Sequence, residues 1–176
     1  MTSTSLRTAL ACIATALLIP CVSHAQRTHS GGRAQGNRSE PGAHYDACKL
    51  LTISDVTPIL GDGATQELTQ GGQNCEFRSA DKKSKLFVRT PESTRTEPEV
   101  TFKNYKTGPH HNYTIADEKD LGDEAVSAIT PSGVEIMALK QHRILYIQDY
   151  GPYGSKGTSD ALNKLRPIAK KAASAF

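Results

Sequence analysis

The sequence has few of the features by which a function is usually recognised, and the first of these is charge. Its formal net charge is only +3. The lysines and arginines are scattered among aspartates and glutamates, without a basic stripe that carries interleaved aromatics. Binding to DNA or RNA needs such a surface to neutralise phosphates. We therefore expect no nucleic-acid partner.

Catalytic and metal-binding motifs are also missing. The sequence contains no G-x-S-x-G turn and no C-x-x-C pair of the redox or zinc type. His44 and Asp46 form an isolated H-x-D pair, and His110 and His111 are adjacent in a loop that follows a proline. Neither pair has the further ligands that a metal site needs. We predict no catalytic residue, no metal and no cofactor.

The N-terminal apolar stretch is too short to span a bilayer as a stable anchor. Residues 1–25 carry one basic residue, Arg7, then the apolar run and a small-residue exit at Ser23 and Ala25. This pattern is typical of a secretory signal peptide. We predict cleavage after Ala25, so that the mature protein starts at Gln26 and is periplasmic or secreted.

A lipoprotein processing site is an alternative interpretation of the same segment. Residues 18–21 have the outline of such a site, in which Cys21 would be acylated and become the new N-terminus. Pro20 argues against it, because its fixed φ angle and missing N–H suit the extended-strand binding of a protease poorly. The protein would be attached to a membrane only if Cys21 were lipidated.

Two cysteines, Cys48 and Cys75, remain after removal of the signal peptide. An exported protein meets an oxidising compartment, which favours disulfides over free thiols, and only one intramolecular pairing is possible. Cys48 precedes an expected helix and Cys75 lies where an expected strand begins. We predict a disulfide that joins the first helix to the sheet and stabilises the fold by about 3 to 4 kcal/mol.

Residues 26–44 have no large aliphatic or aromatic side chain to bury, so they cannot offset the entropy of ordering. We predict a disordered linker there. Residues 45–176 follow as a single α+β domain, which is long enough for one hydrophobic core and too short for two.

Helical periodicity predicts three helices within this domain. Thr52 and Asp55 have the spacing of a capping box at the start of the first helix. A second capping-box pattern at 96–99 opens a short helix, in which we expect Val100 and Tyr105 to face inward. The third helix carries an apolar stripe from Leu162 to Phe176 and is expected to start with Ser159 as its cap.

Alternating and continuous apolar runs predict the strands that lie between these helices. We expect them at 64–69, 75–78, 86–89, 113–115, 125–129, 134–139 and 144–147. The order of helix, strands, helix, strands and helix indicates an antiparallel sheet covered by helices.

The order of these motifs resembles a family of small secreted proteins and lipoproteins, common in actinobacteria, that is classed as a domain of unknown function. The resemblance covers residues 46–176. It depends on CKLLTISDVTPILG at 48–61, on Cys-Glu-Phe at 75–77, where the family usually has Cys-x-Trp, and on LGDEA at 121–125. It implies a helix-covered antiparallel sheet similar to the PsbP-like fold, and no established activity.

Two loops are candidate binding sites. Five carboxylates lie within 117–124, but their spacing departs from an EF-hand, so we interpret the segment as a solvated acidic loop and leave calcium binding open. The glycine-rich loop at 151–158 lies between a strand and a helix, where backbone N–H groups can hold a phosphate, although it does not match the P-loop pattern. Tyr150 and Tyr153 each offer an aromatic ring for contact and a hydroxyl group for hydrogen bonding, and Lys156 adds a positive charge. These three side chains are our candidate binding residues.

Two functional hypotheses follow. The first is an exported, non-enzymatic envelope protein that binds an unknown envelope protein or small ligand. The alternative is a small hydrolase or transferase of the cell envelope whose site the sequence does not reveal. A pocket with convergent ionisable groups would favour the enzyme, whereas a shallow apolar patch would favour binding.

Overall fold

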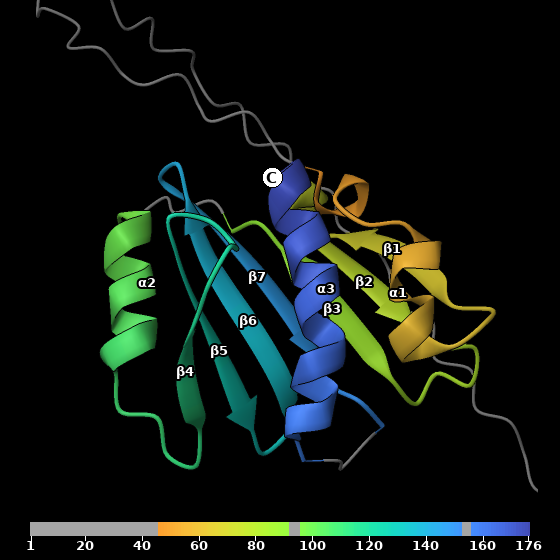
Figure 1. Cartoon of the computed structure of the whole chain (residues 1–176). Helices are drawn as coiled ribbons and strands as arrows, with labels where there is room; N and C mark the ends of the chain where they lie inside the picture. The colour runs from red at the N-terminus through yellow and green to blue at the C-terminus, as the bar shows by residue number, and fades with distance from the viewer. Residues whose placement is uncertain (1–45, 92–95, 153–155) are drawn as a thin grey trace, which may run out of the picture. The chain divides into compact units, whose positions relative to one another are not determined.

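The structure is a computed structural model that describes residues 46–91, 96–152 and 156–176 (Figure 1). The expected signal peptide at 1–25, with its alternative processing sites, and the expected linker at 26–44 lie outside the described residues. Among the described helices, none is both long and apolar enough to cross a membrane.

The described strands form one seven-stranded antiparallel sheet in the order β1-β2-β3-β7-β6-β5-β4. Their bounds are β1 Thr65–Thr69, β2 Asn74–Arg78, β3 Lys85–Arg89, β4 Thr114–Glu118, β5 Glu124–Thr130, β6 Gly133–Lys140 and β7 Arg143–Asp149. The sheet consists of two meanders, β1 to β3 and β4 to β7, which are joined where β3 pairs with β7. The prediction of an antiparallel sheet is confirmed.

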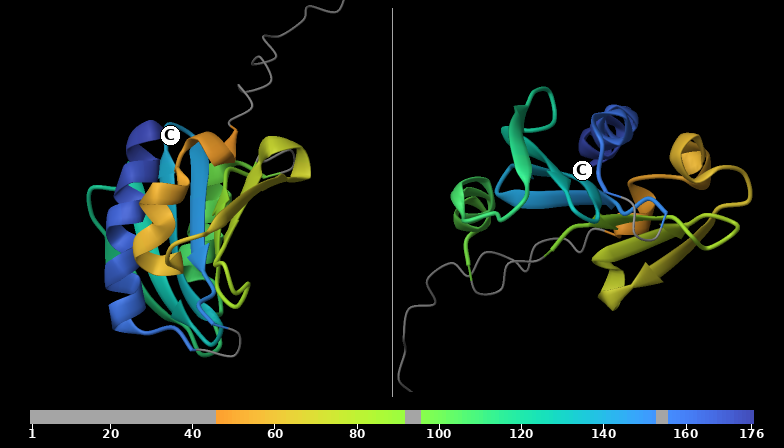
Figure 2. Two further views of the ribbon diagram at one scale, coloured as in Figure 1. Left: turned by 90° about the vertical axis from the view of Figure 1, so that its right-hand side faces the viewer. Right: turned by 90° about the horizontal axis from the view of Figure 1, so that it is seen from below.

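Three α-helices pack against this sheet, and their bounds are α1 Ile53–Leu60, α2 Pro98–Thr107 and α3 Ser159–Ala175. Helices α1 and α3 contact each other and lie on the same side of the sheet (Figure 2). We call this side the α3 face; its strand residues include Phe77, Val88 and Ile147. Helix α2 packs on the opposite side, the α2 face, whose strand residues include Val126 and Met137. The α+β class is therefore confirmed.

The alternation of side chains along the strands places different residue types on the two faces of the sheet. In β3, Leu86 and Val88 are fully buried on the α3 face, while Lys85, Phe87 and Arg89 are partly buried on the α2 face. Successive side chains of a strand point to opposite sides, so the order of residues in β3 dictates this division. The stripe of α3 completes the core with buried side chains at Leu162, Leu165, Ile168, Ala169 and Ala172, as predicted.

The first helix and the disulfide also follow the prediction. The backbone N–H of Thr52 donates to Asp55 Oδ2 at 2.8 Å, which is one half of a capping box. Cys48 and Cys75 are bonded, with an S–S distance of 2.06 Å. Cys48 lies in a short 3₁₀ helix, η1 (Ala47–Lys49), which precedes α1, so the disulfide links this turn to β2.

Three predicted helix details are wrong. Helix α2 has Glu97 as its N-cap residue and no side-chain cap hydrogen bond, so the capping box expected at 96–99 does not form. Val100 does not face inward: its side chain is 46% exposed, and Phe102 is the buried residue of α2. Two positions correspond to about 200° around a helix, so Val100 must point away when Phe102 faces the sheet. Helix α3 is capped by Thr158 rather than Ser159, since Thr158 Oγ1 accepts the N–H of Ala161 at 3.1 Å.

Candidate functional site

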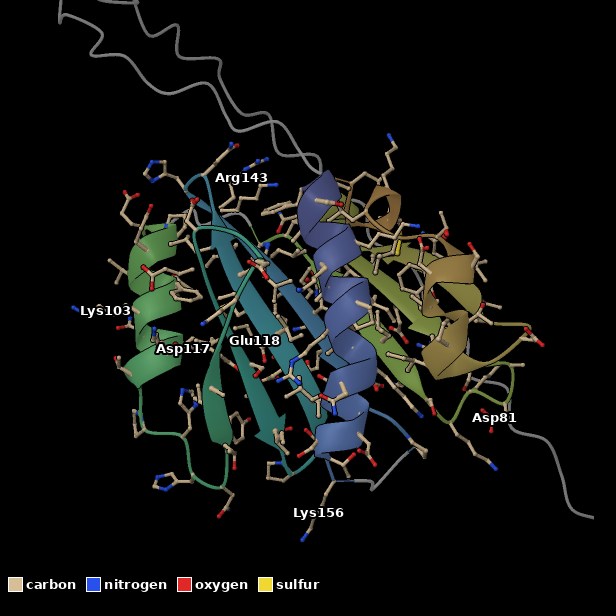
Figure 3. All side chains as sticks on the ribbon, in the orientation of Figure 1. Asp81, Lys103, Asp117, Glu118, Arg143 and Lys156 are labelled. Atoms are coloured by element: carbon tan, nitrogen blue, oxygen red, sulfur yellow. A yellow bond between two sulfur atoms is a disulfide. The ribbon has the colours of Figure 1, made fainter. Side chains whose placement is uncertain are left out.

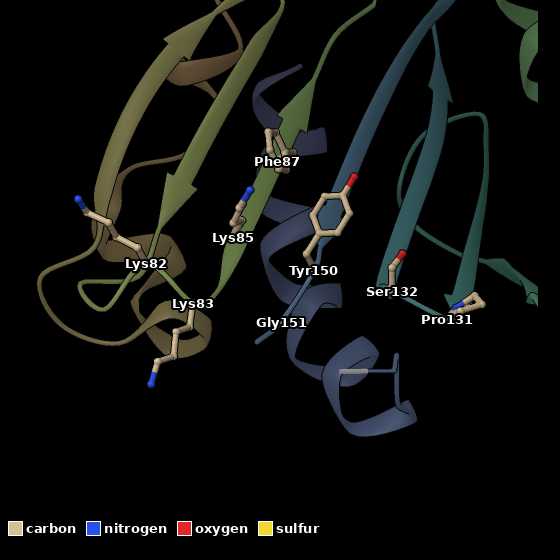
Figure 4. A pocket seen from close by; sticks show the side chains of 8 residues that line it. All are labelled: Lys82, Lys83, Lys85, Phe87, Pro131, Ser132, Tyr150 and Gly151. Carbon is tan, nitrogen blue, oxygen red and sulfur yellow. The ribbon is translucent and has the colours of Figure 1, made fainter. Parts of the chain in front are cut away.

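The three candidate binding residues at 150–156 do not converge. Tyr150 directly follows β7 and lines a pocket (Figure 4). Tyr153 lies outside the described residues. Lys156 is exposed, extends away from the fold near the start of α3 (Figure 3), and does not line the pocket. Of the predicted set, the structure therefore places Tyr150 alone at a site.

This pocket, which we call the basic pocket, has a volume of about 630 Å³. It is lined by Lys82, Lys83, Lys85, Phe87, Pro131, Ser132, Tyr150 and Gly151. The lining comes from three separated segments: the β2–β3 turn with the start of β3, the β5–β6 turn, and the residues after β7. Because Lys85 and Phe87 belong to it, the pocket opens on the α2 face.

One wall is a hydrogen-bonded turn. The Ser79 hydroxyl donates to Asp81 Oδ1 at 2.6 Å, and the N–H of Lys83 donates to the same oxygen at 3.0 Å. The N–H of Lys82 donates to the Ser79 carbonyl at 2.9 Å, and Lys82 adopts a φ of 61°. Asp81 thus acts as an internal brace for the turn, because a short Asp side chain readily accepts from the backbone two residues on.

The opposite wall depends on two glycines that allow backbones to approach closely. A Cβ on Gly157 would lie 1.9 Å from the carbonyl oxygen of Gly133. A Cβ on Gly133, whose φ is 152°, would lie 2.1 Å from the carbonyl oxygen of Asp149. The Gly157 N–H donates to the Thr130 carbonyl at 3.0 Å. These contacts hold the segment before α3 against the β5–β6 turn, and so position Pro131 beside Tyr150.

An aromatic strip leads from the pocket across the α2 face. The rings of Phe87 and Tyr150 meet edge to face, with their centroids 5.4 Å apart. The Arg89 guanidinium lies 5.0 Å from the Phe87 ring centroid and 5.8 Å from that of Tyr146. Tyr146 in turn meets Tyr105 of α2 edge to face at 6.2 Å. The strip is continuous because Arg89 bridges its two halves through cation–π contacts.

A buried carboxylate lies at the α2 end of this strip. Glu135 is only 2% exposed, and it accepts hydrogen bonds from the hydroxyl groups of Tyr105 and Tyr146. Burial, followed by the adjacent Glu135 carboxylate, raises the pKa of both tyrosines well above the ordinary value of 10.0. Both phenols are therefore protonated near neutral pH and serve as donors to Glu135, rather than as bases or nucleophiles.

The acidic segment at 117–124 is only partly the solvated loop that we predicted: its carboxylates are exposed except for Glu118, but only residues 119–123 lie outside the strands. Asp117 and Glu118 belong to β4, where neighbouring side chains point to opposite faces. Asp117 pairs with Lys106 at 2.7 Å, and Glu118 pairs with Arg166 of α3 at 2.7 Å. In the described parts of the chain, no three potential metal ligands form a group.

The histidine pairs have structural contacts. His110 stacks on Tyr113, with centroids 5.3 Å apart, and its ring also contacts Tyr105. His111 is exposed. Asp46 accepts the N–H of Cys48 at 3.0 Å and so caps η1, whereas His44 lies outside the described residues.

Sequence reasoning missed most of the basic pocket. The run SADKKSKLFVR at 79–89 was interpreted as a polar turn and a strand, which is correct as structure. The signal that could have been used is the alternation of Lys85, Phe87 and Arg89, which places basic and aromatic side chains on one face. Comparison of the chain with protein-family models, curated proteins and solved structures finds no match.

Proposed function

We propose that the protein is an exported, non-enzymatic envelope protein that binds a small ligand or a partner protein at the basic pocket. The supporting observation is the lining of a cavity of about 630 Å³, which includes three lysines and two aromatic residues. Lys85 lies close to Phe87, whereas Lys82 and Lys83 extend outward at the rim (Figure 4). A volume of that size is typical of small-molecule sites. The lysines are ionisable groups, which would favour the enzyme, but none of the described lining residues is a histidine or a carboxylate, the groups most often used as catalytic acids and bases. This composition favours binding over the alternative of a hydrolase or transferase.

The disulfide supports the proposed periplasmic or secreted location, because disulfides persist in oxidising compartments. We propose that residues 1–25 are removed as a signal peptide. N-terminal sequencing of the exported protein tests this, with Gln26 expected as the first residue. An acylated Cys21 at the N-terminus would contradict it and would place the protein at a membrane surface.

We also propose that the chain belongs to the secreted family of unknown function and has its PsbP-like fold. The helix-covered antiparallel sheet and the Cys48–Cys75 bond support this proposal. The LGDEA motif supplies the β4–β5 turn, where Leu121 is buried in the main core. A family member whose experimental structure has a different strand order would contradict it.

Native mass spectrometry of the exported protein tests the binding function. We expect a bound compound or partner to accompany the wild type and to be lost from Tyr150→Ala, because Tyr150 forms a wall of the basic pocket. Tyr113→Ala is the matched control, since Tyr113 is an exposed aromatic residue that does not line the pocket. Equal retention by both variants would rule out the pocket as the binding site, and chemical conversion of the bound compound would support the enzyme alternative.

A further inference from the structure

We propose that the basic pocket binds a small planar anion, in which a flat aromatic group is joined to a sulfonate, carboxylate or phosphate. This inference rests on the proposed binding function and names the chemical class of the ligand. It depends on two observations about the lining: two of its three lysines have no ion-pair partner among the described residues, and its apolar surface is mainly aromatic.

The positive charge of the pocket has little compensation. Among the described carboxylates, none forms an ion pair with Lys82 or Lys85, and Asp81 lies 3.9 Å from the Lys83 ammonium in an exposed pair. Asp81 also accepts two hydrogen bonds within its own turn. Lys85 is partly buried, which strengthens its interaction with an anion by lowering the effective dielectric constant.

Two further carboxylates lie near this end of the sheet, and neither lines the pocket. Glu76 is on the α2 face and pairs in register with Phe87, but it forms an ion pair with Arg78. Asp149 is 5% exposed and pairs in register with Leu86 and Val134, so its side chain points to the α3 face. Its Oδ1 accepts the N–H of Gly151 at 2.8 Å. The lysines therefore meet no opposing carboxylate across the cavity among the residues that line it.

A fourth cation lies just beyond the pocket. The guanidinium of Arg89 is 5.0 Å from the centroid of the Phe87 ring. The Nε atom of Arg89 is buried and has no hydrogen-bond partner in the described part of the chain. A buried donor without a partner is costly, and an anion that reached past Phe87 could supply the missing acceptor.

The aromatic lining selects for shape. Phe87 and Tyr150 meet edge to face, and Pro131 lines the pocket on the side of Tyr150 away from Phe87 (Figure 4). Flat ring systems pack well against such edges and faces, with a gain beyond that of simple area burial. Inorganic phosphate would use the lysines but leave this apolar surface exposed to water. The lining is therefore complementary to a ligand that combines a ring with a negative charge.

Two fluorescent probes distinguish the contribution of the negative charge to the binding affinity from the contribution of the aromatic ring system. The anion 8-anilino-1-naphthalenesulfonate and the neutral N-phenyl-1-naphthylamine share their ring system and differ by the sulfonate. We expect titration of the exported protein to give saturable binding of both, with the anion bound at least about fivefold more tightly. The preference should weaken as salt is raised, because exposed charges are screened.

Charge-removing variants then locate the anion. The triple variant Lys82→Gln, Lys83→Gln, Lys85→Gln should lose about tenfold in affinity for the sulfonate, since each exposed or half-buried pair contributes about two- to fivefold. Its affinity for the neutral probe should be unchanged. The control Lys49→Gln, Lys103→Gln, Lys119→Gln removes the same charge from exposed positions outside the lining, and should change either affinity less than twofold. Thermal melts confirm that both variants are folded.

The results distinguish the two proposals. If Tyr150→Ala weakens both probes but the sulfonate has no advantage and the lysine variants bind normally, the pocket is a binding site and the anion inference is wrong. If neither probe binds saturably, or if both bind Tyr150→Ala as well as wild type, the inference and the pocket as a binding site are both wrong.

Discussion

On the α3 face the buried side chains are mostly aliphatic or aromatic, with Asp149 as an exception, whereas on the α2 face they include Glu76, Glu135 and Gln148. The first arrangement needs no explanation beyond stability, because burial of apolar surface drives folding. The second is costly, since buried polar groups must find partners. The α2 face retains its polar groups beside the aromatic strip and the basic pocket. We infer that the α3 face mainly stabilises the fold and that the α2 face carries the candidate functional site.

The polar contacts of the α3 face support this division, because they attach helix to sheet. Lys140 Nζ donates to the Ala173 carbonyl at 2.7 Å, near the end of α3. Arg166 and Glu118 join the middle of α3 to the edge strand β4. Each of these contacts lies at the margin of the core, where a charged group can remain partly in water.

Removal of apolar volume from the α3 face should have the largest effect on stability. Leu165→Ala is expected to lower the free energy of unfolding by about 2–5 kcal/mol, because Leu165 is fully buried and the fold cannot fill the cavity completely. Urea denaturation measures the change. Val100→Ala, at an exposed site of α2, is the control and should change stability by less than about 0.5 kcal/mol. Similar losses of unfolding free energy in Leu165→Ala and Val100→Ala would contradict the special importance of the α3 face for stability.

Loss of the disulfide should have the next largest effect. Cys48→Ala with Cys75→Ala is expected to lower the free energy of unfolding by about 2–4 kcal/mol, since the bond restricts the unfolded chain. Denaturation of the wild type with and without a reducing agent provides an independent measure. A non-reduced digest should contain the linked peptides, and two freely alkylatable thiols in the exported protein would contradict the bond.

The hydroxyl groups around Glu135 test the α2 face directly. Tyr105→Phe and Tyr146→Phe should each cost about 1–3 kcal/mol, because each leaves a buried carboxylate one donor short. Tyr113→Phe is the matched control and should be nearly neutral, since Tyr113 is exposed. The double variant reports the coupling between the two donors. If both single variants are neutral, the polar cluster is not costly to disturb, and the contrast between the faces weakens.

The ion pair of Arg166 and Glu118 should produce the smallest effect, and it should depend on pH. Burial raises the pKa of Glu118, but hydrogen bonds from Arg166 and Ser127 outweigh it and hold the pKa below its ordinary value of 4.5. A carboxyl with a lowered folded-state pKa stabilises the protein above the ordinary pKa, and this contribution is lost as the pH falls through the folded value.

Arg166→Gln is therefore expected to cost about 1 kcal/mol near pH 7 and less at an acidic pH below the lowered folded-state pKa of Glu118, where the carboxyl is protonated. Urea midpoints at the two pH values measure this. Asp55, whose pKa is also lowered by Lys171, contributes equally to wild type and variant, so the difference isolates Glu118. Lys103→Gln should show no such pH dependence. A cost that is the same at both pH values would show that Arg166 acts through packing alone.

The sequence was informative wherever structure is local. The capping box at Thr52, the apolar stripe of α3 and the alternation around Phe87 each follow from spacing over a few residues. Val100 was misplaced because α2 is short and has few apolar residues, so its periodicity did not decide between Val100 and Phe102 as the residue that faces the sheet. The disulfide was predictable because only one pairing exists between cysteines outside the expected signal peptide.

The basic pocket was not predictable, because it is assembled from segments that are distant in sequence. Lys85 on β3 and Tyr150 after β7 become neighbours through the pairing of these two strands, and Pro131 joins them through the close approach of Gly133 and Gly157. No periodicity within any one segment encodes that pairing. Glu135 was interpreted as one residue of a strand for the same reason, since its partners Tyr105 and Tyr146 come from two other elements.

The join between the two meanders also has a consequence for the order of folding. Strands within each meander pair with sequence neighbours, which is fast, whereas β3 must find β7 across the whole of α2 and β4 to β6. The disulfide lies within the first half and does not assist this closure. Because the basic pocket straddles β3 and the end of β7, it is absent until the two halves have docked. A ligand in it would therefore bind only chains that have completed folding, and would slow their return to the unfolded state.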